Sequence, residues 1–491
     1  MLLTKRKEGF MTEKRNLSLL SDFYEFTMAN GYFENGMKDT IAVFDAFYRT
    51  NPDEAGYSIF AGLNDIIDFI ENLHFDDEDI DYLRTVGNFS DGFLDYLRDF
   101  KFTGDVWAFP EGSVMFPNEP IITVKAPIIE CSILETYLLL SMNFNSLIAT
   151  KSSRIARAAK DRLVMEFGAR RAQGADASLT GARAAYIAGV PVSSNTLSAK
   201  NYGFKPSGTM AHSWVQAFDN EYEAFKTYAE AYPENCILLI DTYDTINSGL
   251  PNAMRVFKEV LEPKGLSGGV RIDSGDLAYL SKEVRKILDK NGFTDTKIVA
   301  SNSLDEFKIN SLTAQGAQID SFGIGERLIT SKSDPVFGGV YKLVGIYKND
   351  ELLSKIKVSE NVEKITTPGF KKVYRLYGKE TGKAEADYIT LREEEVDDNN
   401  PLVIFDPLFT WKMKKMENYQ ARLMQEKIFE NGKLIYDQPS LDEIQNYCKS
   451  EIDSLWDEVK RFDQPHNYYV DLSTDLWNLK QNLILEAKKG L

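Results

Sequence analysis

Two different spacings of hydrophobic residues divide the chain into regions. From about residue 150 to 330, short apolar runs alternate with segments in which apolar residues recur every three or four positions. Such alternation is typical of β-α units around a mostly parallel sheet. Ligands of such folds, open sheets or barrels, bind at the carboxyl ends of the strands. The predicted strands are LVMEF (163–167), GVPV (189–192), CILLI (236–240), GGVRI (268–272), KIVA (297–300) and SFGI (321–324).

Helix signals lie between these strands. Pro251 stands near the first turn of one predicted helix, and Asp276 is placed to cap the next. Ser303 and Glu306 have the spacing of a capping box for a third helix. Because each helix follows a predicted strand, the pattern again favours repeated β-α units.

The amino-terminal part mixes helix and strand. Asp22 and Glu25 give a capping-box-like start to a helix that stops near Gly31, and residues 41–49 form a strand. Residues 76–99 hold eight acids and two arginines around a few apolar positions, which predicts solvated helices with an apolar seam.

The carboxyl-terminal part predicts antiparallel hairpins, with turns at 349–350 and near 378–382, an acidic loop at 393–400 and a helical tail from 440 to 490. We therefore divide the chain into three domains. They are an α/β domain at 1–145, completed by parts of 340–440, a catalytic domain at 146–339, and a hairpin region with a helical extension at 340–491.

Composition narrows the class of protein. A chain of 491 residues with 43% hydrophobic residues can bury two or three cores, and a net charge of −17 disfavours nucleic acid or a membrane surface as partner. Three scattered cysteines without a C-x-x-C pair fit a reducing cytoplasm. We find no signal peptide or membrane span, and Met11 is an alternative start that would leave residues 1–10 optional.

Polar residues follow the predicted strands. Asp241–Asp244 follow one strand, Arg271, Asp273 and Asp276 end another, and Ser301–Ser303 follow a third. Arginine grips anions and carboxylates hold Mg²⁺ or sugar hydroxyls, so a phosphate-bearing ligand with Mg²⁺ suits this set. The alternatives are a helix cap for Asp276 and a structural ion pair for Arg271 and Asp273.

The three histidines differ in context. His74 and His466 lie in polar surroundings that favour surface or packing roles. His212 stands in GTMAHSWVQAF, a glycine-containing turn before a helical pattern, where an imidazole can act as nucleophile toward phosphorus or as general base. A hydrogen-bonded structural histidine is the alternative.

A basic segment interrupts the acidic chain. Between Lys151 and Arg183, eight basic residues face three acidic ones. The helical spacing of Arg154, Arg157 and Lys160 predicts a solvated helix face, whereas Arg170 and Arg171 follow a strand and are the better phosphate ligands. The chain has no P-loop, no G-x-G-x-x-G after a strand, no H-E-x-x-H and no G-x-S-x-G, so any ATP site is not a Walker fold.

Long motifs in a fixed order resemble the nicotinate phosphoribosyltransferase family over nearly the whole chain. The resemblance implies an irregular α/β barrel of the type II phosphoribosyltransferase kind plus an amino-terminal α/β domain completed by later segments. It also implies conversion of nicotinate and phosphoribosyl pyrophosphate to nicotinate mononucleotide and pyrophosphate, coupled to ATP hydrolysis, in NAD salvage. The motifs are SDFYEFTMANGYF (21–33), FPEGSVMFPNEPIITV (109–124), EFGARRAQGADASLTGARAAYIAG (166–189), SSNTLSAKNYG (193–203), GTMAHSWVQAF (208–218), DTYDT (241–245), GVRIDSGDL (269–277) and SFGIGERL (321–328).

The resemblance also implies roles for single residues. The family's phosphorylated histidine falls on His212, and its nicotinate contacts fall on Tyr24, Thr209 and Arg271. Carboxylates near the ribose and Mg²⁺ match Asp241 and Asp273, a phosphate-binding arginine matches Arg170, and the phosphate-binding turn matches Gly323 and Gly325. Many relatives have Thr where this chain has Glu326. The family further implies a cytoplasmic homodimer with shared sites, in which Tyr24 acts on the partner's site.

Three other functions are compatible with parts of this pattern. The same fold acts on nicotinamide in a related family, which uses an aspartate near the position that reads Ser-Asn-Thr here (194–196). A barrel glycosidase would use Asp241 and Asp273 as its two carboxylates but leaves Arg271 without a purpose. A catalytically inactive paralogue would bind the ligands without forming product.

Overall fold

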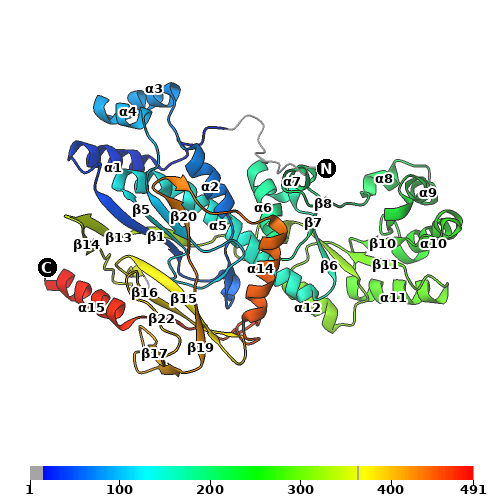
Figure 1. Ribbon diagram of the computed structural model, residues 1–491. Helices are drawn as coiled ribbons and strands as arrows, with labels where there is room; N and C mark the ends of the chain where they lie inside the picture. Colours follow the sequence, from blue (N-terminus) through cyan, green and yellow to red (C-terminus); the bar gives the residue numbers. More distant parts are fainter. Residues whose placement is uncertain (1–14, 362–363, 490–491) are drawn as a thin grey trace, which may run out of the picture. The chain divides into compact units, whose positions relative to one another are not determined.

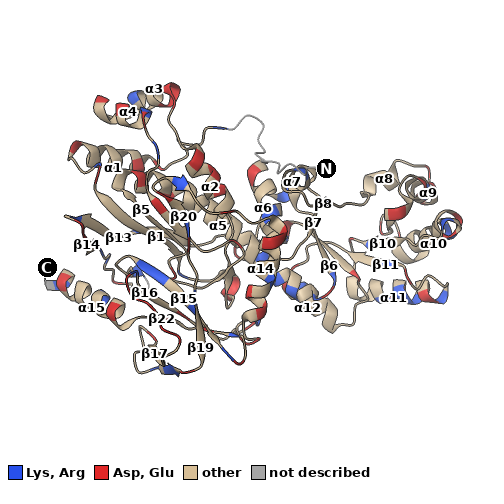
Figure 2. Cartoon of the chain, in the orientation of Figure 1, with Lys and Arg blue, Asp and Glu red and all other residues tan. Residues whose placement is uncertain are grey.

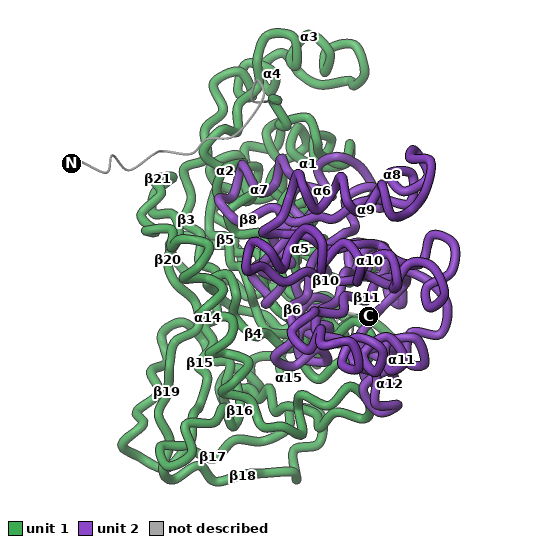
Figure 3. The backbone as a smooth tube through the Cα atoms, turned by 90° about the vertical axis from the view of Figure 1, so that its right-hand side faces the viewer, with its two compact units in different colours: residues 1–147, 336–491 green, residues 148–335 purple. Residues whose placement is uncertain are grey.

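The computed structural model describes residues 15–361 and 364–489, so the predicted alternative start at Met11 lies outside the described residues. The chain forms two compact units, unit 1 from residues 1–147 and 336–491, and unit 2 from residues 148–335 (Figure 3). The carboxyl-terminal hairpins and helices group with unit 1. The long helix α5 (Ile128–Ala159) begins in unit 1 and ends in unit 2.

Unit 1 is built on a seven-stranded sheet in the order β14-β13-β1-β5-β3-β20-β21, whose neighbouring strands run antiparallel. Figure 1 labels β14, β13, β1, β5 and β20 of this sheet. The predicted strand at 41–49 is β1, and the turn predicted at 349–350 joins β13 to β14, with positive φ at Asn349 and Asp350. The strands are β1 (Ile41–Tyr48), β3 (Asp105–Ala108), β5 (Ile122–Pro127), β13 (Gly339–Lys348), β14 (Glu351–Ser354), β20 (Glu426–Glu430) and β21 (Lys433–Leu434).

A second sheet of unit 1 has the order β19-β15-β16-β22. The predicted hairpin near 378–382 joins β15 to β16. The strands of this second sheet are β15 (Lys371–Gly378), β16 (Ala384–Leu391), β19 (Tyr419–Leu423) and β22 (Val470–Leu472). Two further sheets have two strands each: β17 (Leu402–Phe405) pairs with β18 (Met413–Met416), and β2 (Ser58–Ile59) pairs with β4 (Val114–Met115).

Helices complete unit 1. The acidic segment at 76–99 forms α3 and α4 as predicted, and both helices contain acidic residues, coloured red in Figure 2. Asp22 precedes α1 without making a side-chain cap, and α1 continues past Gly31 to Glu34, so both predictions for this helix were wrong in detail. The helices are α1 (Phe23–Glu34), α2 (Leu63–Asn72), α3 (Asp77–Val86), α4 (Asp91–Arg98), α14 (Leu441–Ser454) and α15 (Thr474–Lys489), with a short 3₁₀ turn at Pro52–Glu54.

Unit 2 carries a curled parallel sheet of seven strands in the order β8-β7-β6-β12-β11-β10-β9. This mixed α/β architecture confirms the predicted fold class. Because all strands run the same way, their carboxyl ends lie along one edge. The strands are β6 (Leu163–Glu166), β7 (Val192–Ser193), β8 (Lys205–Pro206), β9 (Ile237–Leu239), β10 (Gly269–Ile272), β11 (Lys297–Ala300) and β12 (Ser321–Ile324).

Most helix signals of unit 2 were read correctly. Asp276 caps α11 by accepting from the Tyr279 N–H, as predicted. The predicted capping box at Ser303 and Glu306 is wrong, because Ser303 has positive φ and Asp305 caps α12. The helices are α6 (Ala175–Ile187), α7 (Thr196–Tyr202), α8 (His212–Gln216), α9 (Glu221–Ala231), α10 (Leu250–Val256), α11 (Leu277–Lys290), α12 (Glu306–Ala314) and α13 (Glu326–Ile329), with π or 3₁₀ turns at Ala169–Arg171, Pro233–Asn235, Thr245–Gly249, Phe257–Leu261 and Glu262–Lys264.

One basic helix position differs from the sequence prediction. Arg154 is buried rather than solvated, and it pairs with the fully buried Glu306 at 2.8 Å. Lys151 reaches the same carboxylate at 2.9 Å. The helical spacing of charged residues could not predict this pair, because the buried partner Glu306 lies 152 residues later in the chain. Among the described residues, no helix has the length and apolar character needed to span a membrane.

Candidate active site

The carboxyl ends of five neighbouring strands bring the candidate residues of unit 2 to one edge of its sheet. Asp241 follows β9, Arg271 lies in β10 and Asp273 follows it, Ser301 follows β11, and Gly325 follows β12. Arg170 belongs to the turn after β6, the strand paired with β12. The strand order β6-β12-β11-β10-β9 thus gathers residues that are up to 155 positions apart in the chain.

Arg271 is the centre of the hydrogen-bond network at this edge. Its Nη1 donates to Thr209 Oγ1 at 2.9 Å and to the Met210 carbonyl at 3.4 Å. Its Nε donates to Ser301 Oγ at 3.0 Å, and its Nη2 to Asp273 Oδ1 at 3.2 Å. A guanidinium held through all three nitrogens has a fixed orientation, and the Arg271 side chain keeps 14% of its surface exposed.

The two candidate carboxylates are linked through the backbone. Asp241 Oδ2 accepts from the Asp273 N–H at 2.9 Å and from the Ser274 hydroxyl at 2.6 Å. Asp241 Oδ1 is buried and lacks a hydrogen-bond partner in the described part of the chain. A buried acceptor without a donor is costly, so this oxygen is suited to a ligand.

His212 begins α8, as the turn before the helical pattern predicted. Its Nδ1 lies 3.0 Å from Thr242 Oγ1, and its Nε2 lies 4.0 Å from Asp273 Oδ2. The side chain is 41% exposed. The ring is therefore oriented on one side and accessible from solvent, as a nucleophile must be.

The turn after β6 is held by a buried carboxylate. Glu166 accepts from the Gly168 N–H and from the Ser193 hydroxyl, and burial raises its pKa while these two bonds lower it. Arg170 and Arg171 lie in this turn with exposed side chains. Both side chains are therefore accessible to a ligand near the carboxyl end of β6.

The predicted glycine turn has a packing reason as well. A Cβ on Gly323 would stand 2.6 Å from the ring of Phe167, and a Cβ on Gly325 would stand 3.1 Å from the Phe167 carbonyl oxygen. The same Phe167 ring lies 5.8 Å from the Arg271 guanidinium carbon. Glycines at 323 and 325 let the backbone pass close to Phe167 beneath the site.

Glu326 begins α13, directly after this turn, and forms an ion pair with Lys332. The hydrogen bond from Lys332 lowers the pKa of Glu326, so the residue is a carboxylate at neutral pH. Glu326 therefore places a negative charge directly after the predicted phosphate-binding turn.

The remaining predicted residues lie elsewhere. Tyr24 is on α1 in unit 1, where it is 45% exposed and burial, followed by the charge of Glu135, raises its pKa. His74 and His466 are exposed residues of unit 1, as expected for surface histidines. Asp276 acts as a helix cap, the alternative considered for it.

Sequence reasoning assigned no role to several contacts of the site. Thr242 orients His212, and Ser301 bridges Arg271 to Asp273. Ser301 precedes two residues with positive φ, Asn302 and Ser303, whose turn fixes its direction. Thr242 and Ser301 could have been identified from their positions just after predicted strands, because residues at the carboxyl ends of parallel strands meet at one edge of the sheet.

A parallel sheet with this site defines the class as a type II phosphoribosyltransferase fold. The crystal structure of human nicotinic acid phosphoribosyltransferase superposes with a TM-score of 0.82 at 29% identity, covering 95% of this chain and 100% of that one.

Family models place the chain more narrowly. The amino-terminal domain model of nicotinate phosphoribosyltransferase matches residues 19–143, the family model matches 163–366, and the carboxyl-terminal domain model matches 370–480. A nicotinate phosphoribosyltransferase of Bacillus subtilis is 46% identical over 97% of both chains, and one of Mycobacterium tuberculosis is 39% identical over 93% of this chain and 91% of its own. The chain belongs to the nicotinate phosphoribosyltransferase family.

Proposed function

We propose that this protein transfers the phosphoribosyl group of phosphoribosyl pyrophosphate to nicotinate, releasing pyrophosphate and forming nicotinate mononucleotide for NAD salvage. The observation that carries the proposal is the joined cluster of Arg271, Asp273 and His212 at the carboxyl edge of a parallel sheet, in a chain of this family. We place the catalytic residues in unit 2, within the domain predicted at 146–339.

The reaction requires little proton transfer. The pyridine nitrogen of nicotinate attacks C1 of the ribose with its own lone pair, and the bond from C1 to pyrophosphate breaks. The pyrophosphate leaves with the bonding electrons while positive charge develops on the ribose. Fixed donors and rigid positioning therefore contribute most of the rate.

Arg271 and Thr209 are proposed to bind the nicotinate carboxylate. They are hydrogen-bonded to each other, so one anionic group can contact both. Because Arg271 already makes four hydrogen bonds to protein groups, its orientation is set before the substrate arrives. Arg170 and the turn at Gly323 and Gly325 are proposed to bind phosphate groups, and Tyr24 to stack on the pyridine ring.

The carboxylates fit a Mg²⁺ ion shared with the substrate. Asp241 offers a buried oxygen that has no partner among the described residues, and its other oxygen accepts from the backbone N–H of Asp273. No group of three or more acidic, histidine or cysteine side chains forms a complete metal site among the described residues. Mg²⁺ commonly uses one or two carboxylates plus substrate phosphates. When bound, the ion would neutralise charge on the leaving pyrophosphate.

ATP is proposed to phosphorylate His212. The imidazole nitrogen takes the terminal phosphoryl group, ADP leaves, and the ring proton passes to solvent. Water later cleaves the nitrogen–phosphorus bond and releases phosphate. The added charge stands near Asp273, 4.0 Å from the unmodified ring, and can therefore alter the site's affinity for anions.

We also propose a homodimer in the cytoplasm. Apolar side chains are exposed around Tyr24 on and before α1, including Leu20 at 43%, Phe23 at 50% and Met28 at 38%. Such a patch suits a contact with a second copy, in which Tyr24 would serve the partner's site. The three cysteines are buried free thiols, which suits a reducing compartment.

The test is an assay of pyrophosphate and mononucleotide formation from phosphoribosyl pyrophosphate, with nicotinate or nicotinamide and with or without ATP. We expect turnover of nicotinate, stimulation by ATP, and little turnover of nicotinamide. The segment 194–196 contains no acid, and Asn195 there caps α7. Faster turnover of nicotinamide than of nicotinate would assign the chain the related nicotinamide activity instead. Binding of the substrates without formation of mononucleotide would show that the protein is an inactive paralogue.

A further inference from the structure

Unit 1 contains a cavity that the proposed reaction does not use. Its volume is about 250 Å³. Three segments line it, namely the start of β16, the residues that follow α14 and the residues that precede β22. Its chemistry comes from four rings and two carboxylates, Trp456, His466, Tyr468, Tyr469, Glu385 and Glu458.

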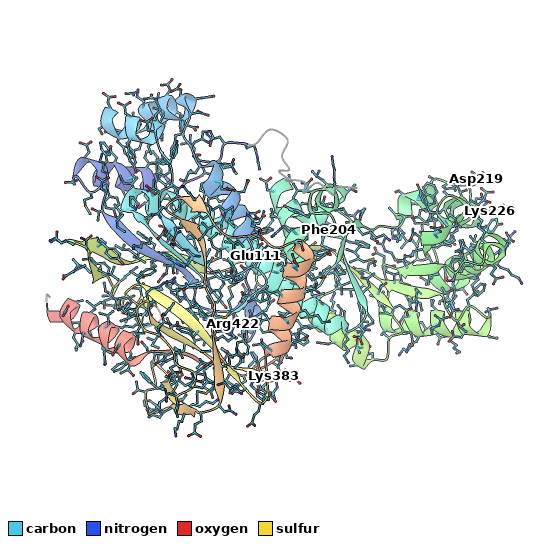
Figure 4. The ribbon with its side chains drawn as sticks, viewed as in Figure 1. Glu111, Phe204, Asp219, Lys226, Lys383 and Arg422 are labelled. Carbon is cyan, nitrogen blue, oxygen red and sulfur yellow. The ribbon has the colours of Figure 1, made fainter. Side chains whose placement is uncertain are left out.

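The walls of this cavity are fixed by contacts outside it. Lys383, labelled in Figure 4, donates from Nζ to the carbonyls of Asp453 at 2.6 Å and Leu455 at 3.1 Å, which joins the start of β16 to the chain just before Trp456. The His466 N–H donates to the Glu458 carbonyl at 2.9 Å. The cavity therefore exists before any ligand binds, which lowers the entropic cost of binding.

The lining residue Tyr468 is also held by contacts outside the cavity. The Tyr468 ring stacks on Phe116 with centroids 3.8 Å apart and planes 7° apart. Its hydroxyl donates to Asp387 Oδ1 at 2.9 Å, so the polar end of Tyr468 is already satisfied. What Tyr468 can offer to a ligand in the cavity is its ring.

The other rings leave large aromatic surfaces uncovered. Trp456 is 38% exposed and Tyr469 is 44% exposed. His466 meets Tyr469 edge to face at 5.8 Å. Aromatic faces carry negative potential and attract cations, most strongly when several rings surround one charge.

The two carboxylates add negative charge. Glu385 pairs with Lys414 at 2.7 Å, and Glu458 pairs with Arg461 at 3.6 Å. The Arg461 and Glu458 side chains are 55% and 52% exposed, and exposed pairs of this kind contribute little energy, so a ligand cation can compete for Glu458. Glu385 is less exposed, at 20%, and its pair with Lys414 is the firmer of the two.

We propose that this cavity binds a small organic cation, a quaternary or protonated ammonium held between the rings and beside the carboxylates. The cavity volume of about 250 Å³ is below that of most drug-sized sites, so the ligand is a small free molecule. The substrates of the proposed reaction are anions. The site is therefore distinct in chemistry from the cluster around Arg271.

The probe for this site is choline, titrated into the full-length protein and followed by tryptophan fluorescence and calorimetry. Its neutral isostere, 3,3-dimethylbutan-1-ol, has the same shape without the charge. We expect choline to bind with a Kd on the order of 1 mM or tighter, and the alcohol to bind at least about fivefold more weakly. Equal binding of both compounds, or no saturation of choline up to about 20 mM, would overturn the proposal.

Variants locate the binding within the cavity. Trp456→Leu should weaken choline about tenfold, and Glu458→Gln should weaken it severalfold. The matched control is Trp411→Leu, because Trp411 is 73% exposed and does not line the cavity. If Trp456→Leu fails to fold, Tyr469→Leu replaces it, since that ring is the more exposed.

These variants also separate the cavity from the proposed function. Mononucleotide formation should be unchanged in Trp456→Leu and Glu458→Gln. Unchanged choline affinity in both variants would contradict the assignment of the cavity. If the unmodified protein forms no mononucleotide, that result contradicts only the proposed function.

Discussion

Two clusters of arginine and acidic side chains, one around Arg375 in unit 1 and one around Arg271 in unit 2, have opposite properties. In unit 1, Arg375 is completely buried and pairs with Asp387 at 2.6 Å and with Glu451 at 2.7 Å. In unit 2, Arg271 pairs with Asp273 at 3.2 Å, and these side chains are 14% and 33% exposed. The same residue types thus form a closed network in one unit and an open one in the other.

The difference lies in what remains available to a ligand. Arg375 also donates to the Val114 carbonyl, and Asp387 also accepts from Tyr468, so that network is filled by protein groups. The open cluster keeps an exposed His212 ring and the Asp241 Oδ1 atom, to which no described residue donates. Removing one member of a closed network costs stability, whereas removing one member of an open network costs function.

Arg375→Met should have the largest effect on stability. It leaves Asp387 and Glu451 buried without their cation, and breaking such a network costs about 3–5 kcal/mol. Denaturant unfolding of the full chain measures this loss. The control is Arg98→Met, because Arg98 is 41% exposed and ion pairs between exposed side chains contribute little to stability. Equal losses in both variants would contradict the role of the buried network.

Arg271→Lys should leave the unfolding free energy nearly unchanged and lower kcat/KM for nicotinate about a hundredfold to a thousandfold. Lysine keeps the charge but cannot make the Nε and Nη bonds to Ser301, Thr209 and Asp273 together. Steady-state kinetics measure the effect, with the exposed Arg255→Lys as control. A fall of less than about fivefold would contradict the proposed contact.

Ser301→Ala should lower kcat/KM about tenfold, because it removes hydrogen bonds to two charged groups, Arg271 and Asp273. Ser301→Thr keeps a hydroxyl and should recover part of the rate. Ser281→Ala is a matched control, since Ser281 is a buried serine of α11 that bonds to the Ala278 carbonyl. If Ser281→Ala lowers kcat/KM equally, Ser301 has no special positioning role.

Glu119→Gln should have the smallest effect, and a stabilising one at neutral pH. Burial and the neighbouring Asp387 raise the pKa of Glu119 well above its usual value. A raised pKa gives stability that is complete below the unfolded pKa and lost as pH rises through the folded pKa. The glutamine variant should therefore show a flatter decline of unfolding free energy above about pH 5. A steeper decline in the variant would contradict the sign.

The parallel core of unit 2 was predictable because its strands are short apolar runs between helix signals. KIVA and SFGI form β11 and β12 with the predicted bounds. The strand predicted at 189–192 was displaced to Val192–Ser193, because the chain first makes a positive-φ turn at Gly189. Local patterns specify local elements but not where a turn ends.

Contacts between distant segments were harder to predict. Asp273 and His212 were found because each stands beside a recognisable element, whereas the Thr242–His212 contact joins residues 30 positions apart. The buried Arg154–Glu306 pair was missed for the same reason. Such pairs depend on the strand order of the sheet, which no short segment of sequence contains.

Parallel measurement of nicotinate-dependent ATP hydrolysis and mononucleotide formation, in the unmodified protein and in His212→Ala, tests the central claim most directly. If the open cluster of unit 2 is the active site, the unmodified protein hydrolyses ATP and forms mononucleotide. The His212→Ala variant loses ATP hydrolysis but retains some ATP-independent formation of mononucleotide. A His212→Ala variant that hydrolyses ATP at the normal rate in the presence of nicotinate would contradict the claim.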